Sequence, residues 1–177
     1  MTESKTASKV TSTKAAAKKT AASPTRGDAI ALLMKDHRDV KKLFNAYQKL
    51  ANAEASATQR LGFVKEICEA LFLHATVEEE IFYPAMRATA VDAKDELDEA
   101  EVEHASVKEL VAQIQSMDPD DELYNAKVKV LGEYVDHHVR EEEREMFPKA
   151  KKSGMELEDI GQQIKTRKKE LQGAGLH

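Results

Sequence analysis

Two segments of the chain repeat one pattern: a histidine, a glutamate four positions later, and a proline six positions after the glutamate. The two copies are His74, Glu78 and Pro84, and His138, Glu142 and Pro148. Both copies lie in apolar segments, and residues four apart share one face of a helix. Imidazole nitrogens and carboxylate oxygens are ligands for iron, manganese and zinc. The repeat therefore predicts a metal site.

Helices are expected around these residues, because apolar side chains recur at spacings of three and four and good helix formers dominate the composition. The expected helices run from Asp28 to about Asn52, from about Thr58 to Met86, from Asp92 to a break at residues 117–121, and from there to about Phe147. A short amphipathic helix should follow Ser153 and pack outside the others. The sequence thus predicts an all-α fold, an up-down-up-down four-helix bundle with a short extra C-terminal helix.

In such a bundle each long helix brings one histidine to the same level. His37 lies about 15 residues before the end of the first helix, and His74 about 16 residues into the second. His104 and His138 match the same level to within about one helical turn. The bundle interior should therefore hold one layer that consists of His37, His74, Glu78, His104, His138 and Glu142.

Burying this layer without a cation would be costly. A lone histidine on an apolar face is usually a hydrogen-bonded core residue. Two inward carboxylates are a different case, because burying each one without a partner lowers the stability of the fold by several kcal/mol. With four imidazoles, the cost would approach the whole free energy of unfolding of a domain, roughly 5–15 kcal/mol. A bound cation reverses the sign of that cost, so metal binding is the favoured interpretation.

Other polar residues near the repeat are expected to have smaller roles. His137 shares its helix face with charged residues and should lie on the solvated surface. Tyr134 should lie in the core or donate a hydrogen bond near the site, and Cys68 should only be packed. The neighbouring acidic residues are expected to be ordinary charged residues of the surface, although one of them could hydrogen-bond to a metal ligand from behind. These residues are Glu79, Glu80, Glu141 and Glu143.

Charge is distributed unevenly over the 177 residues. Residues 1–27 carry a net charge of +5, and the remainder carries −10. The first segment has too few large apolar side chains to fold, so we expect a disordered Lys/Ala-rich tail at 1–27. The bundle should occupy 28–150, and the C-terminal helix and chain end 151–177. Nucleic-acid binding by the tail is a weak alternative, because the tail has few charges and no aromatic residues.

The sequence also indicates where the protein is located and which classes of enzyme it does not resemble. No run of about 18 apolar residues occurs, so no membrane-spanning segment is expected. The single cysteine excludes an intrachain disulfide, and residues 1–27 contain no apolar segment typical of a secretory signal, so we expect a cytoplasmic location. The sequence contains no serine–histidine–aspartate set, phosphate-binding loop or dinucleotide-binding fingerprint.

The chain resembles the hemerythrin-like, or HHE cation-binding, domain family over about residues 28–150. The matching residues are His37, His74, Glu78, His104, His138 and Glu142. This resemblance implies two non-haem iron ions per chain with carboxylate bridges, for which Glu78 and Glu142 are the candidates. Manganese or zinc would suit the same ligands, so the choice of iron depends on the resemblance.

One position departs from the oxygen-carrying hemerythrins, which place a second histidine four residues after the first on the third helix. Lys108 occupies that position and is expected to extend toward solvent. Six protein ligands in place of seven argue against reversible oxygen carriage. We therefore expect a sensor or protective protein that binds or reacts with oxygen, peroxide or nitric oxide. An iron-binding or iron-handling protein without turnover is the alternative, and the sequence leaves enzymatic activity and any protein partner open.

Overall fold

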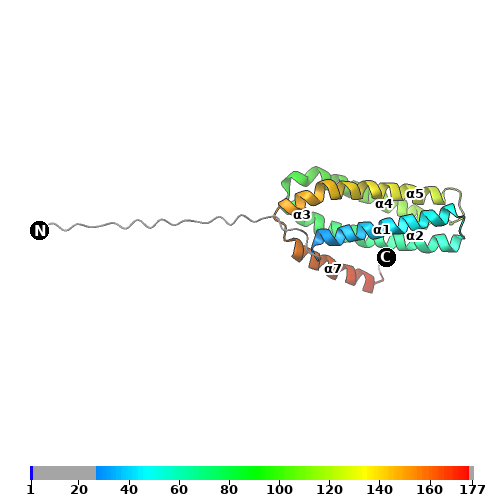
Figure 1. Cartoon of the computed structure of the whole chain (residues 1–177), viewed down its shortest axis with the longest axis horizontal. Coiled ribbons are helices and arrows are strands. Elements are labelled where there is room, and N and C mark those ends of the chain that lie inside the picture. Colours follow the sequence, from blue (N-terminus) through cyan, green and yellow to red (C-terminus); the bar gives the residue numbers. More distant parts are fainter. Residues whose placement is uncertain (2–26, 176–177) are drawn as a thin grey trace.

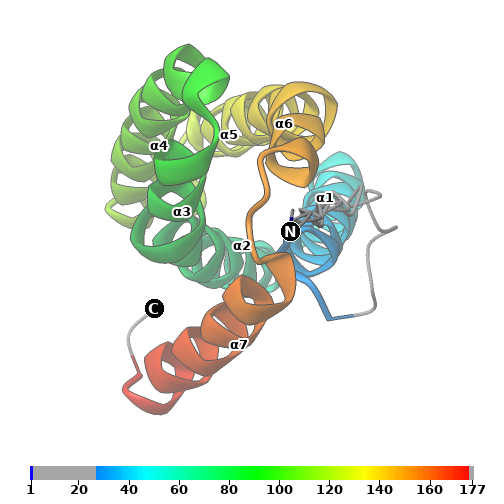
Figure 2. The same cartoon turned by 90° about the vertical axis from the view of Figure 1, so that its left-hand side faces the viewer.

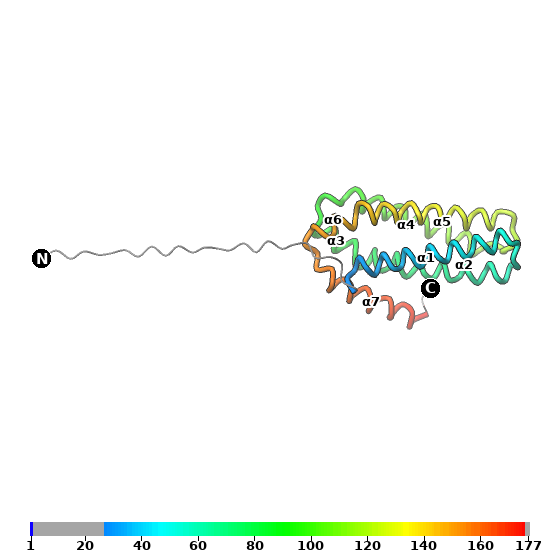
Figure 3. The backbone as a smooth tube through the Cα atoms, in the orientation of Figure 1, coloured from blue at the N-terminus to red at the C-terminus, as the bar shows by residue number. Residues whose placement is uncertain are grey.

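The computed structural model describes Met1 and residues 27–175, so the tail expected at 1–27 lies almost entirely outside the described residues. Four rods run along a common axis (Figure 1) and surround a common centre when viewed end-on (Figure 2). Two of the connections between rods lie at one end of the bundle and the third lies at the other end (Figure 3). The expected up-down-up-down bundle is confirmed, and residues 27–175 contain no strand.

Each rod after the first consists of more than one helical segment. The first rod is α1 (Ala29–Asn52), and the second is α2 (Ala57–Val77), η1 (Glu78–Phe82) and α3 (Tyr83–Thr89). The third is η2 (Val91–Ala93) and α4 (Lys94–Gln115), and the fourth is α5 (Tyr124–Glu141), η3 (Glu142–Met146) and α6 (Phe147–Lys152). The expected C-terminal helix is α7 (Leu157–Gly173). Asp28 caps α1 as expected, because its side chain accepts a hydrogen bond from the N–H of Ala31 at 2.8 Å.

The segments η1 and η3 are single π-helical turns, which the helical period did not predict. In η1 the N–H of Tyr83 donates to the carbonyl of Glu78, five residues back, and Pro84 follows at once. In a regular helix, proline lacks the N–H donor and clashes with the carbonyl four residues back. The wider turn accommodates the proline, and the second copy repeats this with Glu142 and Pro148. The second and fourth rods end at Thr89 and Lys152, three and five residues beyond the ends expected at Met86 and Phe147.

The histidine layer lies between two apolar clusters. One cluster includes Leu33 and Phe82, and the other includes Val40 and Leu71. His37 separates Leu33 from Val40 along α1, and the histidines of the other rods likewise lie where one cluster gives way to the other. The bundle therefore has a polar layer across the middle of an otherwise apolar core.

Two expectations outside this layer have different outcomes. Cys68 is buried as expected, and burial raises the pKa of its thiol to about 11. The expectation for Tyr134 is wrong, because this residue is 51% exposed and points away from the core. None of the helices described between residues 27 and 175 is long and apolar enough to cross a membrane.

Helix α7 lies outside the ring of four rods, against α1 and α2 (Figure 2). Ile160, Ile164 and Leu171 form its buried face. Gly161 lies against the backbone that enters α1, where an added Cβ would come within 2.4 Å of the carbonyl oxygen of Gly27. Only a residue without a side chain fits this contact, so Gly161 determines how closely α7 approaches the bundle.

The substitution Gly161→Ala should therefore destabilise the protein. The added methyl group has to displace backbone, which costs about 1–3 kcal/mol for overpacking, and the melting temperature followed by circular dichroism should fall. Gly62→Ala is the matched control, because nothing lies within 4 Å of the added Cβ, and alanine favours a helix by about 1 kcal/mol over glycine. Equal melting temperatures for the two variants would contradict the close contact of α7.

Candidate metal centre

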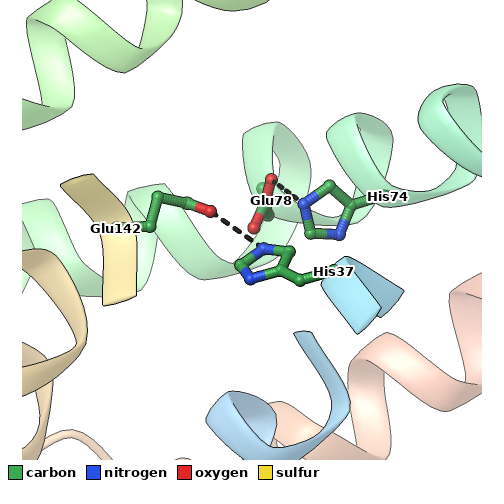
Figure 4. A group of neighbouring side chains, drawn as sticks. All are labelled: His37, His74, Glu78 and Glu142. Atoms are coloured by element: carbon green, nitrogen blue, oxygen red, sulfur yellow. Dashed lines mark ion pairs between the residues drawn. The ribbon is translucent and has the colours of Figure 1, made fainter. Parts of the chain in front are cut away.

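The structure brings the six residues of the sequence-predicted layer together in the middle of the bundle, each at most 6% exposed. They come from all four rods: His37 from α1, His74 from α2, Glu78 from η1, His104 from α4, His138 from α5 and Glu142 from η3. Figure 4 shows four of them with their polar atoms directed toward one another.

The six side chains form two overlapping groups, in each of which one ligand atom per residue lies within 4.8 Å of the others. The first group is His37, His74, Glu78 and Glu142, and the second is Glu78, His104 and His138. Glu78 belongs to both, since its Oε2 lies 3.1 Å from Nε2 of His74 and 3.5 Å from Nε2 of His104. Glu78 therefore links the two groups.

Glu142 occupies the equivalent position on the other side of the layer. Its Oε2 lies 3.1 Å from Nε2 of His37 and 3.5 Å from Nε2 of His138. Both carboxylates thus lie between a histidine of the first two rods and a histidine of the last two. Each carboxylate therefore offers an oxygen to histidines of two different rods.

The layer also contains most of the unsatisfied polar atoms in the core. Within residues 27–175, seven buried side-chain nitrogen or oxygen atoms make no hydrogen bond, and six of them belong to His37, His74, Glu78 and Glu142. An unsatisfied buried group costs about 1–3 kcal/mol, and more when it is charged. All of these six except Nδ1 of His74, which faces Asp36, lie toward the layer. Nitrogen and oxygen atoms clustered in this way fit the coordination chemistry of a divalent cation, which would satisfy them.

The electrostatics of the layer favour a cation as well. Burial raises the pKa of Glu78 well above its ordinary value, and the negative charge of Glu142 adds to the effect. Burial also pushes the pKa of Glu142 upward, but His138 and His37 hold it below its ordinary value. Burial lowers the pKa of His74 to about 4, so this imidazole is neutral near pH 7 and can donate a lone pair to a metal.

Each of the four histidines has a carboxylate at Nδ1, opposite the nitrogen that faces the layer. The pairs are His37 with Glu143 at 3.0 Å, His74 with Asp36 at 3.5 Å, His104 with Glu79 at 2.9 Å and His138 with Glu103 at 2.8 Å. A carboxylate at Nδ1 orients the ring, favours the proton on Nδ1 and leaves the Nε2 lone pair for a metal.

These outer carboxylates were only partly foreseen. Glu79 and Glu143 take the supporting role that the sequence allowed to one acidic neighbour, whereas Glu80 pairs with Arg167 and Glu141 with His137 at the surface. Two further partners, Asp36 and Glu103, were missed. Their signal is an acidic residue directly before His37 and before His104. The sequence alone did not reveal their supporting role, because each of these acidic residues supports the histidine of a neighbouring rod and not the histidine next to it.

Lys108 does not reach the layer. Its side chain is 53% exposed, and Nζ donates to both carboxylate oxygens of Glu79 at 2.6 and 2.7 Å. The hydrogen bond with His104 lowers the pKa of Glu79 most, and Lys108 lowers it further, so this pKa is about 2 despite the partial burial of the carboxyl. The lysine that replaces a potential ligand therefore keeps the carboxylate behind His104 ionised and in position.

Tyr83 belongs to the site although the sequence did not single it out. Its buried hydroxyl donates to Oε1 of Glu142 at 2.9 Å and lies 3.5 Å from Nε2 of His104. The equivalent residue in the second copy, also directly before a proline, is Phe147, which stacks on His37 with ring centroids 5.7 Å apart. One half of the site thus has a phenol where the other half has a phenyl ring.

A small apolar cavity of ≈ 30 Å³ lies beside the four histidines. Its other walls include Val40, Leu71, Val107, Val135 and Val139. The cavity can hold about one or two water-sized molecules. A wider groove of ≈ 350 Å³ between α1 and α5 shares His37, Val40, Val135 and Val139 with it. Only these four side chains thus lie on both the groove and the cavity.

Comparison with known proteins adds independent findings. The family model of the hemerythrin HHE cation-binding domain matches residues 28–150. A crystal structure of an HHE cation-binding domain-containing protein from Mycobacterium kansasii superimposes with a TM-score of 0.70, at 23% identity, over 84% of this chain and 90% of that chain. The structural match supports the fold.

Sequence relatives include uncharacterized proteins of Mycobacterium tuberculosis and Mycobacterium bovis. Each is 24% identical over 148 residues, which cover 82% of this chain and 88% of the relative. A DNA nickase of Nostoc sp. is 30% identical over 112 residues, or 63% of this chain. The match covers only 30% of the nickase, so this chain spans less than a third of that relative.

Substitution of the layer histidines should lower metal content and stability together. His74→Ala and His138→Ala each remove an inward nitrogen, and metal binding contributes to folding free energy. Metal analysis and thermal unfolding should therefore show parallel losses. His137→Ala, which changes the neighbour of His138 on the exposed face, should retain both at equilibrium. Loss of the metal from His137→Ala with retention in His138→Ala would contradict the assignment on α5.

Removal of an outer carboxylate should weaken metal binding without emptying the layer. Glu79→Gln leaves Nδ1 of His104 without a charged acceptor, and such outer partners typically contribute 10–100-fold in metal affinity. Competition with a chelator would measure this loss. Glu80→Gln is the control, because it is the next residue and loses the same charge but pairs with Arg167 on α7. A similar affinity for both variants would exclude a supporting role for Glu79.

Proposed function

The chain belongs to the hemerythrin HHE cation-binding domain family, and on that premise we propose that it is a non-haem diiron protein that reacts with oxygen or peroxide. The observation that supports this proposal is the placement of Glu78 and Glu142, each between two histidines of different halves of the bundle. The proposed ligands are His37, His74, Glu78, His104, His138 and Glu142. Iron supplies one-electron redox chemistry when bound, and manganese or zinc are the alternative occupants.

The donor set leaves room for an external ligand. Four imidazole nitrogens and four carboxylate oxygens are fewer donor atoms than two octahedral ions use. A metal with an open position can bind an oxidant directly. The adjoining cavity of ≈ 30 Å³ admits oxygen, peroxide or nitric oxide, and its size excludes larger substrates. These features favour a small molecule as the physiological ligand.

Tyr83 also places a hydrogen-bond donor at this site. Burial raises the pKa of Tyr83 well above its ordinary value, so the phenol stays protonated and continues to donate to Glu142. A phenol with a raised pKa is a weak acid, so Tyr83 fixes the position of the Glu142 carboxylate beside His104 and does not release its proton.

Two other functions remain for comparison. An iron-handling protein would use the same ligands without consuming an oxidant, so turnover separates it from the proposal. Nucleic-acid binding was expected only of the tail, which lies outside the described residues. The DNA nickase relative adds little to that alternative, because 70% of its length has no counterpart in this alignment.

Iron-loaded protein prepared without oxygen should contain two iron ions per chain and should consume added oxygen or hydrogen peroxide. Stopped-flow absorbance and an oxygen electrode would follow the reaction, and zinc-loaded protein is the control because zinc has no redox chemistry. We expect oxidation in air without a spectrum that reverses when oxygen is removed. A reversible spectrum would favour oxygen carriage, and an inert iron-loaded protein would favour iron handling.

A further inference from the structure

An acidic cavity of ≈ 40 Å³ lies between α4 and the fourth rod and adjoins the histidine layer on the side away from α1. Glutamates form most of its lining, which consists of Glu96, Glu99, Ala100, Glu103, His138, Glu141, Glu142, Glu145 and Met146. No lysine or arginine lines it, although Lys149 pairs with Glu96 at its edge. The lining therefore concentrates negative charge in a space that ends at two of the proposed ligands.

The inner end of this cavity has an unsatisfied carboxylate atom. Glu142 is fully buried, and although its Oε1 accepts the Tyr83 hydrogen bond, Oε2 has no hydrogen-bond partner among the described residues. This atom faces Nε2 of His37 at 3.1 Å and Nε2 of His138 at 3.5 Å, and because the adjoining space is acidic, a cation at this point would further stabilise its charge. The inner end of the cavity is thus suited to receive a positive ion.

The outer end has a separate group of ligand-type atoms on the protein surface. Nε2 of His137 lies 3.2 Å from Oε1 of Glu141 and 3.5 Å from Oε1 of Glu103. These three residues, which we term the outer cluster, satisfy the same 4.8 Å proximity as the buried groups. His137 is 55% exposed, so the outer cluster is open to solvent.

Glu103 connects the outer cluster to the buried layer. While its Oε1 faces His137, its Oε2 lies 2.8 Å from Nδ1 of His138. Glu103 and Glu141 also line the acidic cavity. A continuous series of oxygen and imidazole groups thus extends from solvent to Glu142.

We propose that the outer cluster captures divalent metal ions from solvent and delivers them through the acidic cavity to the buried centre. This inference depends on the proposed function only in requiring that the buried centre holds a metal. One imidazole and two carboxylates on an exposed surface bind a cation weakly, which permits its release inward. The acidic lining attracts cations and raises their local concentration, as clefts of one charge do.

The groove between α1 and α5 is a poorer route for a cation. Its basic and acidic side chains pair with one another, Lys41 with Asp136, Arg140 with Asp136 and Lys129 with Glu133. The groove shares His37, Val40, Val135 and Val139 with the apolar cavity beside the histidines. It therefore suits an uncharged ligand, whereas the acidic cavity suits the metal.

The rate of metal uptake tests this proposal. Metal-free protein mixed with Co²⁺ should develop the visible absorption of bound cobalt, and the double variant His137→Ala with Glu141→Gln should do so about tenfold more slowly, the lower end of electrostatic steering effects. The final cobalt content per chain should equal that of the unmodified protein. Raising the salt concentration should slow uptake by the unmodified protein more than uptake by the variant.

Glu133→Gln is the matched control, because it neutralises an exposed glutamate on the same helix outside the acidic cavity. Its uptake rate should be unchanged. Equal uptake rates for the double variant and the unmodified protein would overturn the capture role, as would an equal slowing in the control. A lower final cobalt content with an unchanged rate would place His137 and Glu141 in the centre itself and also overturn capture. Failure of the unmodified protein to bind any metal would instead refute the proposed function, and capture with it.

Discussion

The structure depends on keeping two carboxylates and four imidazoles in one buried layer. Apolar clusters above and below the layer fix the rods, and the rods fix the distances of 3.1–3.5 Å between Glu78, Glu142 and the histidines. This burial raises the pKa of Glu78 and leaves polar atoms of the layer without hydrogen bonds. The protein thus gives up stability in its core and retains a strong preference for a cation there.

The positions of the six inward residues could be predicted because they follow from two regular features of a helix, the spacing of residues on one face and the rise per residue. The four-residue spacing places His74 beside Glu78, and rise per residue places His37 at the level of His74. The same helical geometry explains the error at Tyr134. At 3.6 residues per turn this residue lies at the edge of the face defined by Leu131, Val135 and His138, and only that face is buried.

The remaining parts of the site depend on contacts between rods, which no period within a helix reveals. Asp36 supports His74 and Glu103 supports His138, in each case from a neighbouring rod. The π turn was likewise hidden, because helical periodicity does not show one extra residue. Helix α7 extends these contacts beyond the bundle, since Lys168 pairs with Asp36 behind His74. A helix outside residues 28–150 therefore contributes to the support of a proposed ligand.

The outer carboxylates follow a rule that relates the two halves of the chain. Glu79 and Glu143 directly follow the two motif glutamates, and they support His104 on the third rod and His37 on the first. Asp36 and Glu103 directly precede His37 and His104, and they support the motif histidines His74 and His138. The two helical hairpins are therefore related by an approximate twofold axis through the layer. Tyr83 and Phe147 occupy matching places and break that symmetry. Any two ions held between the halves would consequently be inequivalent, with the phenol beside only one side of the pair.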